Sequence, residues 1–505
     1  MRDGIATDEI MQIKVEVALE LKITIIYTDD QFSNPITYTF GTIFSILGAE
    51  YRILPYSEVE ANKSFIKGLL ISYGREKIDV NAEYRIHIYQ SQLFSRDYGT
   101  ASSMPRLPLK LWNGLPVIYE GSGDVRELVM QSENLIETNI DIIASSFFML
   151  SRYEESILNV RDQHGRFPAS ASVAFKENFL TRPIVNEYID LLWKWIDDFQ
   201  IGIERKVLWN GKNLAVILTH DVDLIRKYRW WLPPLNSLAR TIKRRQLAKS
   251  LHYGIDWTTS SLKIKPDPYW NFDEIIELEH KYEFTSSFYF MTGANTKYDR
   301  YRYSINNSKV VALIKKLERA AHEVGLHGSY NSFNDYEVFI KEKNKLDQIV
   351  SNKKYGSRQH YLRWKTPDTW QILEKAGILY DSSLGYADHN GFRCGVCFPY
   401  KPFDVMADRK MDIWELPLIV MDKQSSDYQD TNPEYIFQRT KRLINTVKNH
   451  NGVFVLLTHN SSFYRLQNFE LSNFYEKVLA YMSEQCVFNS SAQELVKHWQ
   501  NSIAQ

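Results

Sequence analysis

From Leu214 to the end of the chain, short apolar runs alternate with longer amphipathic stretches. The runs have the length and composition of buried strands, and the stretches between them have the spacing of helices. Buried strands that alternate with helices predict a parallel sheet, which can close into a barrel. Strands are expected at 214–218, 286–290, 324–326, 361–363, 413–416 and 453–457, with helices such as 308–321 and 368–376 between them.

The chain before this region predicts a smaller α/β domain over residues 1–205 that ends in a helical linker. We expect residues 206–505 to form the second domain. Strands are predicted at 23–27, 69–73, 85–89 and 116–119, and helices at 35–47, 141–151 and 184–199.

A charged stretch from Arg152 to Pro168 predicts a surface loop, because Gly and Pro punctuate it. Arg161, His164 and Arg166 in this loop are interpreted first as a salt-bridged surface connection. The alternative is that they contact a substrate or another domain.

Overall composition excludes several classes of protein. The 505 residues carry 61 basic and 61 acidic side chains, so no net positive field favours nucleic acid. Three cysteines argue against a disulfide framework. We expect no membrane span, because no run of about 18 apolar residues occurs. The segment Met1–Lys14 lacks the apolar core of a secretory signal, which favours the cytoplasm.

The first chemical motif is Asp221-Val222-Asp223, directly after the predicted strand at 214–218. Two carboxylates two residues apart on an extended backbone point to the same side. One can bind a metal ion while the other accepts a proton from water held by that ion. The alternative is a helix cap or a turn, for which Asp is also favoured.

Two histidines follow later predicted strands. His327 comes after Val324–Leu326, and Asn331 stands four residues further on, which suits a divalent metal. His459 follows the strand at 453–457, where an imidazole can donate a proton to a leaving group. The alternatives are a hydrogen-bonded core histidine and a helix cap, respectively.

In chain order these motifs resemble the polysaccharide deacetylase family (carbohydrate esterase family 4, with a NodB-like homology domain). The resemblance covers residues 212–505. It rests on Thr219–Asp223, on Ala321–His327, on Leu456–His459, and more loosely on Arg363–Pro367 preceded by Arg358-Gln359-His360. The segments Tyr380–Ser383 and Glu415–Pro417 are also similar to bacterial members.

The resemblance implies a distorted (β/α)7-type barrel and a set of roles. Asp221 would be the general base and His459 the general acid. Arg363, or in second place Arg358, would orient the base. Asp223 and His327 would bind a divalent metal, with Zn expected and Co, Ni, Fe or Mn as alternatives.

One position departs from the family pattern, because Asn331 stands where the family has its second metal-binding histidine. An amide oxygen is a harder ligand than imidazole and lowers affinity for zinc. Three outcomes follow, in this order: Asn331 binds weakly, His360 or His220 takes its place, or the site holds no metal.

The predicted function is metal-dependent hydrolysis of an N- or O-acetyl group on a saccharide, such as a cell-surface polysaccharide intermediate. The alternatives are a cyclic-amide amidohydrolase and a carbohydrate-binding protein with a decayed site. Aromatic side chains expected to stack on a sugar or pack in the core are Trp364, Trp370, Tyr386 and Trp414. The sequence predicts neither the oligomeric state nor a role for the first domain.

Overall fold

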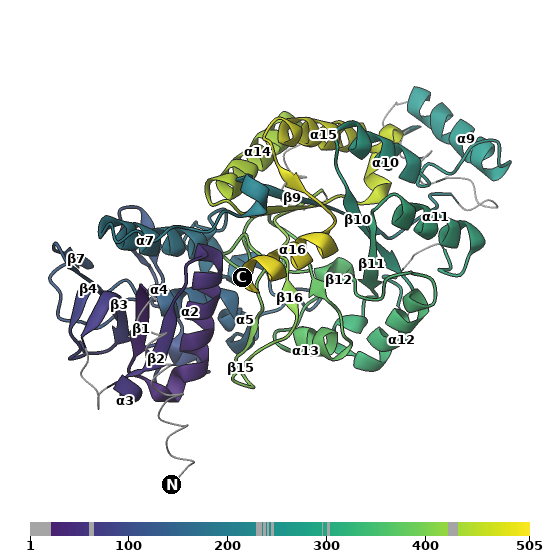
Figure 1. The fold of residues 1–505 in the computed structure, drawn as a ribbon. Coiled ribbons are helices and arrows are strands. Elements are labelled where there is room, and N and C mark those ends of the chain that lie inside the picture. Colours follow the sequence, from purple (N-terminus) through teal and green to yellow (C-terminus); the bar gives the residue numbers. More distant parts are fainter. Residues whose placement is uncertain are drawn as a thin grey trace, which may run out of the picture. The chain divides into compact units, whose positions relative to one another are not determined.

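The computed structural model describes residues 22–59, 65–228, 235, 239, 242–243, 247–294, 296–299, 303–422 and 433–504 (Figure 1). The segment Met1–Lys14, from which a cytoplasmic location was predicted, lies outside these residues. The chain divides into two compact units. The first comprises residues 1–159, 183–207 and 402–410, and the second comprises 160–182, 208–401 and 411–505. A border between independent domains at 205/206 stays a prediction.

The first unit is built on a sheet whose strands are parallel except at one edge. Its strand order is β2-β1-β3-β4-β8-β7, and β7 is antiparallel to β8. Three of these strands contain the runs predicted at 23–27, 69–73 and 85–89. The bounds are β1 Ile23–Tyr27, β2 Arg52–Pro55, β3 Ile66–Gly74, β4 Ala82–Tyr89, β7 Val129–Gln131 and β8 Leu135–Thr138.

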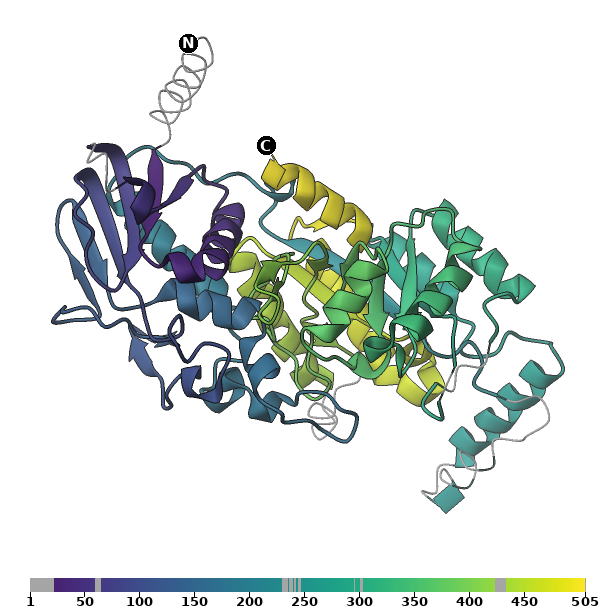
Figure 2. The same ribbon diagram turned by 90° about the horizontal axis from the view of Figure 1, so that it is seen from below.

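Three helices of the first unit contact one another: α2 (Ser33–Leu47), α4 (Ile142–Leu150) and α7 (Ile184–Asp198). In Figure 2 α2 lies beside the purple strands of this unit. Asp141 caps α4, because its side chain accepts a hydrogen bond of 2.9 Å from the amide of Ala144. Shorter elements are α3 Tyr56–Val59, the hairpin β5 Lys110–Trp112 with β6 Leu115–Val117, and the pair β14 Phe403–Asp404 with β15 Arg409–Lys410.

The prediction that a surface loop begins at Arg152 is wrong. Residues Tyr153–Ile157 form the short helix α5, and the side chain of Arg152 is fully buried. Its guanidinium lies 3.1 Å from Glu154 and 2.9 Å from Glu155, both buried as well. A charged side chain can be buried when it is paired in this way, so charge alone did not indicate exposure.

The second unit is built on a curled parallel sheet. Among the described residues, nine strands form it in the order β16-β13-β12-β11-β10-β9-β18-β17, with β19 paired to β9. Every pairing is parallel. The bounds are β9 Ala215–Val222, β10 Ser286–Met291, β11 Glu323–Gly328, β12 Gly356–Gln359, β13 Tyr380–Asp381, β16 Trp414–Glu415, β17 Val420–Met421, β18 Val453–Leu457 and β19 Phe488–Asn489.

Helices follow most of these strands, and α10 to α15 lie around the outside of the sheet in Figure 1. This arrangement confirms the α/β alternation expected from Leu214 onward. The bounds are α6 Val173–Lys176, α9 Leu247–Ser261, α10 Phe272–Lys281, α11 Ser308–Arg319, α12 Tyr336–Asp347, α13 Asp368–Lys375, α14 Pro433–Asn449, α15 Arg465–Ser483 and α16 Ala492–Ala504.

One predicted strand is misplaced. Residues 361–363 belong to a tight turn in which Tyr361 and Leu362 have φ of 63° and 51°. The strand next to it is β12, Gly356–Gln359, which is buried although three of its four residues are polar. The apolar pattern therefore pointed to the turn after the strand instead of to the strand itself.

Two buried tyrosines link β10 and β13, which are not neighbours in the sheet. The hydroxyl groups of Tyr289 and Tyr380 lie 2.8 Å apart, and both side chains are fully buried. Two glycines leave the space that these rings need. A Cβ atom on Gly325 would lie 2.7 Å from the Tyr289 ring, and one on Gly356 would lie 2.0 Å from Tyr380.

Candidate active site

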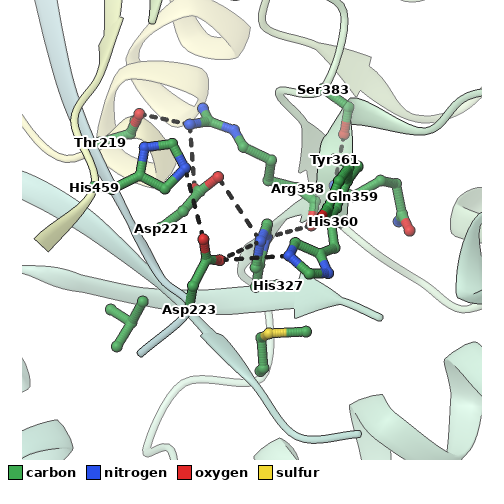
Figure 3. A network of polar contacts seen from close by, with 12 residues as sticks. Thr219, Asp221, Asp223, His327, Arg358, Gln359, His360, Tyr361, Ser383 and His459 are labelled. Carbon is green, nitrogen blue, oxygen red and sulfur yellow. Dashed lines mark hydrogen bonds and ion pairs between the residues drawn. The ribbon is translucent and has the colours of Figure 1, made fainter. Parts of the chain in front are cut away.

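Five side chains meet at the carboxyl ends of four strands of the second unit's sheet (Figure 3). Asp221 is near the end of β9 and Asp223 directly follows it. His327 lies near the end of β11, His360 directly follows β12, and His459 comes two residues after β18. Because the carboxyl ends of parallel strands share one edge of a sheet, residues far apart in sequence converge there.

Three of these residues form a group that could hold a metal ion. One ligand atom each from Asp223, His327 and His360 lies within 4.8 Å of the others. Asp223 Oδ1 is 3.2 Å from His327 Nε2 and 3.8 Å from His360 Nε2. One carboxylate and two imidazoles are a donor set that zinc and other divalent metals use.

The other ring nitrogen of each histidine is occupied. His327 Nδ1 lies 3.0 Å from the carbonyl oxygen of Arg358, and His360 Nδ1 lies 3.1 Å from Asp299 Oδ1. A carbonyl oxygen only accepts, so Nδ1 of His327 carries the hydrogen, and its Nε2 can offer a lone pair. Partners of this kind fix the orientation and tautomer of metal-binding histidines.

The electrostatics of the group favour a positive charge between the ligands. Burial raises the pKa of Asp223, but the His327 ring 3.2 Å away and the charges of His360 and His459 hold it well below its usual range. Burial lowers the pKa of His327, and the carboxylates of Asp221 and Asp223 outweigh this and raise it. Asp223 is therefore ionised, as a metal ligand must be.

Asp221 is held by an arginine from the neighbouring part of the sheet. Arg358 Nη1 lies 3.4 Å from Asp221 Oδ1 and donates a 2.8 Å hydrogen bond to Thr219 Oγ1. The guanidinium also donates to the carbonyl and hydroxyl oxygens of Ser382, at 2.8 Å and 3.0 Å. Arg358 is fully buried, so its position is fixed by these contacts.

The arginine expected first for this role lies elsewhere. Arg363 donates to the carbonyl oxygens of His164 and Tyr330, at 2.7 Å and 2.6 Å. Its guanidinium also lies over the rings of Tyr330 and Phe333. Of the two candidates, Arg358 contacts Asp221, because the turn after β12 directs Arg363 away from the strand ends.

His459 faces the same group from the opposite side, as Figure 3 shows. Its Nε2 lies 3.7 Å from Asp223 Oδ2. Its Nδ1 lies 2.7 Å from Asp422 Oδ1, and its backbone amide donates to Asp422 Oδ2 at 2.8 Å. Sequence reasoning missed Asp422, which directly follows β17. Its position at a strand end was the signal that could have found it.

The two remaining ligand candidates make other contacts. Asn331 Oδ1 accepts a 3.2 Å hydrogen bond from Arg363. His220 is fully buried, with Nε2 at 2.7 Å from Glu279 and Nδ1 at 2.9 Å from the carbonyl oxygen of Thr458. Both ring nitrogens of His220 are thus engaged away from Asp223, whereas His360 lies beside it.

A cavity of about 660 Å³ opens over these residues. Besides the charged groups, its walls include the aromatic rings of Tyr298 and Tyr361 and the apolar side chains of Met291 and Leu362. The four aromatic residues expected to stack on a sugar or to pack in the core are buried and do not line this cavity, in agreement with core packing: Trp364, Trp370, Tyr386 and Trp414.

The charged loop of residues 161–168 supplies one wall of the cavity. Arg166 lines it, pairs with Asp162 at 2.8 Å, and donates to the carbonyl oxygen of Tyr361 at 2.9 Å. His164 Nδ1 lies 3.0 Å from the hydroxyl of Tyr330. The salt-bridged loop expected from the sequence thus also reaches the candidate site.

Residues 24–200 match a family of unknown function, DUF7033. This match covers less than half of the chain. No curated protein matches the sequence. None of the described helices is long and apolar enough to cross a membrane.

Three solved structures are similar to part of the chain. A protein described as a polysaccharide deacetylase from Mycobacterium smegmatis has 18% identity and a TM-score of 0.38, covering 58% of this chain and 91% of its own. Puue allantoinase has 12% identity and a TM-score of 0.37, and the match covers 59% of this chain and 97% of the allantoinase. A protein described as a polysaccharide deacetylase from Pseudomonas aeruginosa PAO1 has 13% identity and a TM-score of 0.37. The match covers 59% of this chain and 98% of that protein. Similarity at this level assigns no activity to the chain.

Proposed function

We propose that the chain is a metal-dependent hydrolase that removes an acetyl group from a saccharide, as the motif resemblance implies. The observation that carries the proposal is the convergence of Asp223, His327 and His360 beside two further groups suited to proton transfer, Asp221 and His459. The donor set fits a divalent metal such as zinc, which would polarise the acyl oxygen and acidify a water molecule.

Asp221 is the proposed general base. The guanidinium of Arg358 fixes one oxygen of its carboxylate, and Asp221 Oδ2 lies 3.8 Å from His327 Nε2, next to the proposed metal position. A carboxylate in this place can accept a proton from water that attacks the acyl carbon.

His459 is the proposed general acid. Its Nδ1 faces the carboxylate of Asp422, which holds the ring with Nε2 turned to the cavity. A ring held in this way can give an Nε2 proton to a departing amine or alcohol, with the Asp422 carboxyl group holding Nδ1.

The walls of the cavity suit a sugar substrate. Its volume lies in the range of small-ligand sites, and its lining combines charged groups with the rings of Tyr298 and Tyr361. Aromatic faces can pack against the apolar side of a sugar ring. We also propose that the protein acts in the cytoplasm.

The distorted barrel is also part of the proposal. Residues 414–421 pair with β13 at their start and with β18 at their end. The amide of Leu416 donates to the carbonyl of Asp381, and that of Ile419 donates to Val455. One extended segment thus bridges the two ends of the sheet, which is how a (β/α)7-type barrel would close.

Two variants test the chemistry. Asp221→Asn and His459→Ala are expected to lower the rate of deacetylation by about 10²- to 10⁴-fold, the range that acid–base groups contribute. The assay is acetate release from N- and O-acetylated saccharides, with metal content as the control for Asp221→Asn. Rates equal to wild type would reject the proposal.

A second pair of variants tests the metal ligands. His360→Ala should lose bound metal, whereas Asn331→His should leave metal content and activity within about twofold, because Asn331 contacts Arg363 and does not line the cavity. Tighter zinc binding by Asn331→His would show that the metal lies nearer to Asn331.

Two outcomes point to the alternative functions. Hydrolysis of cyclic ureides or imides in preference to acetylated sugars would assign a cyclic-amide amidohydrolase. Saccharide binding without stoichiometric metal and without hydrolysis would assign a carbohydrate-binding protein with a decayed site.

A further inference from the structure

A buried polar cluster lies behind the candidate active site, on the face of β9 opposite to Asp221. Successive side chains of a strand point to opposite faces, so His220 points away from the cavity while Asp221 points toward it. The His220 ring is fully buried and packs against the Phe288 ring, with centroids 4.6 Å apart. Its contacts are therefore made only with protein groups of the core.

Both nitrogens of the His220 ring face hydrogen-bond acceptors. Nε2 lies 2.7 Å from Glu279 Oε1, and Nδ1 lies 2.9 Å from the carbonyl oxygen of Thr458. Glu279 also accepts from the hydroxyl groups of Tyr475, at 2.5 Å, and Ser286, at 2.6 Å. Carboxylate and carbonyl oxygens both accept, so the His220 ring forms a bridge between Glu279 and the peptide of Thr458.

The carbonyl group that His220 holds is one residue before His459. The amide of Thr458 in turn donates to the carbonyl oxygen of Thr219, at 2.9 Å. The end of β18 is thus tied to β9 by the backbone of Thr458 on one side and by the His220 ring on the other. Each strand end carries one of the proposed proton-transfer residues, Asp221 and His459.

We propose that His220 and Glu279 form a buried clamp that sets the spacing between Asp221 and His459. This inference rests on the function proposed above. The pair touches no substrate, so both are positioning residues. Glu279 fixes the orientation of the His220 ring, and the ring fixes the peptide that precedes His459. Because a small error in the position of an acid or base costs rate more than binding, the clamp should act on kcat.

The test replaces the clamp by apolar groups of similar size. In the triple variant His220→Phe, Glu279→Leu, Tyr475→Phe no buried charge is left unpaired, so the variant should melt within a few degrees of wild type. We expect wild-type metal content, KM within about twofold and kcat lowered by about 10- to 100-fold, as for residues that orient reactive groups. A wild-type kcat would overturn the proposal.

Two further variants keep the test decisive. His322→Gln is the matched control, because His322 Nδ1 lies 4.0 Å from the same carboxylate but contacts neither strand end. It should change melting and leave kcat unchanged. If the triple variant does not fold, the isosteric Glu279→Gln should still lower kcat at constant KM, and an unchanged kcat would overturn the clamp.

A measurement without substrate separates this inference from the proposed function. In protein with ¹⁵N-labelled histidine, the His459 signals should shift in the triple variant but not in His322→Gln. If wild type hydrolyses no acetylated saccharide, the proposed function fails, and the clamp is still judged by these signals. Unshifted His459 signals in the triple variant would overturn it.

Discussion

At the amino ends of the strands in the second unit, the buried carboxylate of Glu323 accepts hydrogen bonds on both oxygens. They come from the hydroxyl groups of Ser287 and Tyr380 and from the amides of Gly356 and Gln493, at 2.8–3.1 Å. At the carboxyl ends, Asp223 Oδ1 is also buried, but no hydrogen bond reaches it in the described part of the chain.

This difference separates a structural use of buried charge from a functional one. Four donors around Glu323 satisfy its oxygens, so the group needs nothing further. Asp223 instead faces ring nitrogens at 3.2 Å and 3.8 Å, and these gaps suit an added cation. The structural mark of the candidate site is thus a buried carboxylate oxygen that accepts no hydrogen bond and lies beside two ring nitrogens.

The largest effect that would sharpen this comparison comes from Asp223→Ala. We expect the variant to bind no metal, and its hydrolytic activity to fall by roughly a thousandfold or more. Metal at a hundred times its Kd should raise the free energy of unfolding of wild type by about 2.7 kcal/mol, and this gain should vanish in the variant. Calorimetric titration and melting with added zinc measure both.

The control for that variant is the metal-free protein. Without metal, Asp223→Ala should unfold within about 1 kcal/mol of wild type, because the buried Oδ1 of Asp223 accepts no hydrogen bond. A large loss of stability in the absence of metal would mean that Asp223 is a structural residue, and the contrast with Glu323 would disappear.

The next effect concerns Glu323→Ala at the opposite end of the sheet. Removing the carboxylate takes the acceptor from the buried donors Ser287, Gly356 and Gln493 and leaves the Tyr380 hydroxyl only Tyr289, so the free energy of unfolding should fall by about 3–5 kcal/mol. Activity per folded molecule should stay as in wild type. Urea unfolding and active-site titration measure the two quantities, and Glu323→Gln, which keeps one acceptor, should lose less.

The smallest effect is a pH dependence at the same end of the sheet. His322 Nδ1 accepts from the amide of Ser286 at 3.1 Å, and burial lowers the pKa of its ring despite the nearby Glu279. The unfolded chain takes up this proton near pH 6.5, and the folded chain does so only at lower pH. Stability from this group is therefore complete above pH 6.5 and falls as the pH decreases below it.

His322→Gln should remove that part of the pH dependence. Below pH 6.5 wild type should lose stability relative to the variant by at most about 1.4 kcal/mol per pH unit, the limit for one proton. Unfolding curves at several pH values test this. A parallel pH response of the two proteins would show that the His322 ring is not held neutral.

The strands were predictable where β-branched and apolar residues cluster. The runs at 23–27 and 453–457 coincide with β1 and β18 because their side chains are buried on both faces. The strand β12 could not be found in this way, since Ser357, Arg358 and Gln359 are buried through hydrogen bonds instead of apolar contacts. Local pattern does not record partners that are distant in sequence.

The candidate site was predictable where a motif follows a strand, as for Asp221, Asp223, His327 and His459. The supporting residues were not, because each acts through a contact that only the fold creates. Asp422 and Asp299 fix histidines 37 and 61 residues away in the chain. The choice between Arg358 and Arg363 depended on a turn with positive φ, which the sequence does not announce.

The paired tyrosines Tyr289 and Tyr380 lie on the same sheet as the candidate site. Tyr289 and Tyr380 are in contact through their hydroxyl groups, and their rings occupy the space beside Gly325 and Gly356. The cavity lies at the carboxyl ends of the strands, so a ligand of the candidate site would meet its reactive groups from that side. Any side chain larger than glycine at position 325 or 356 would have to displace a tyrosine ring, so the sheet fixes this pair by what it omits.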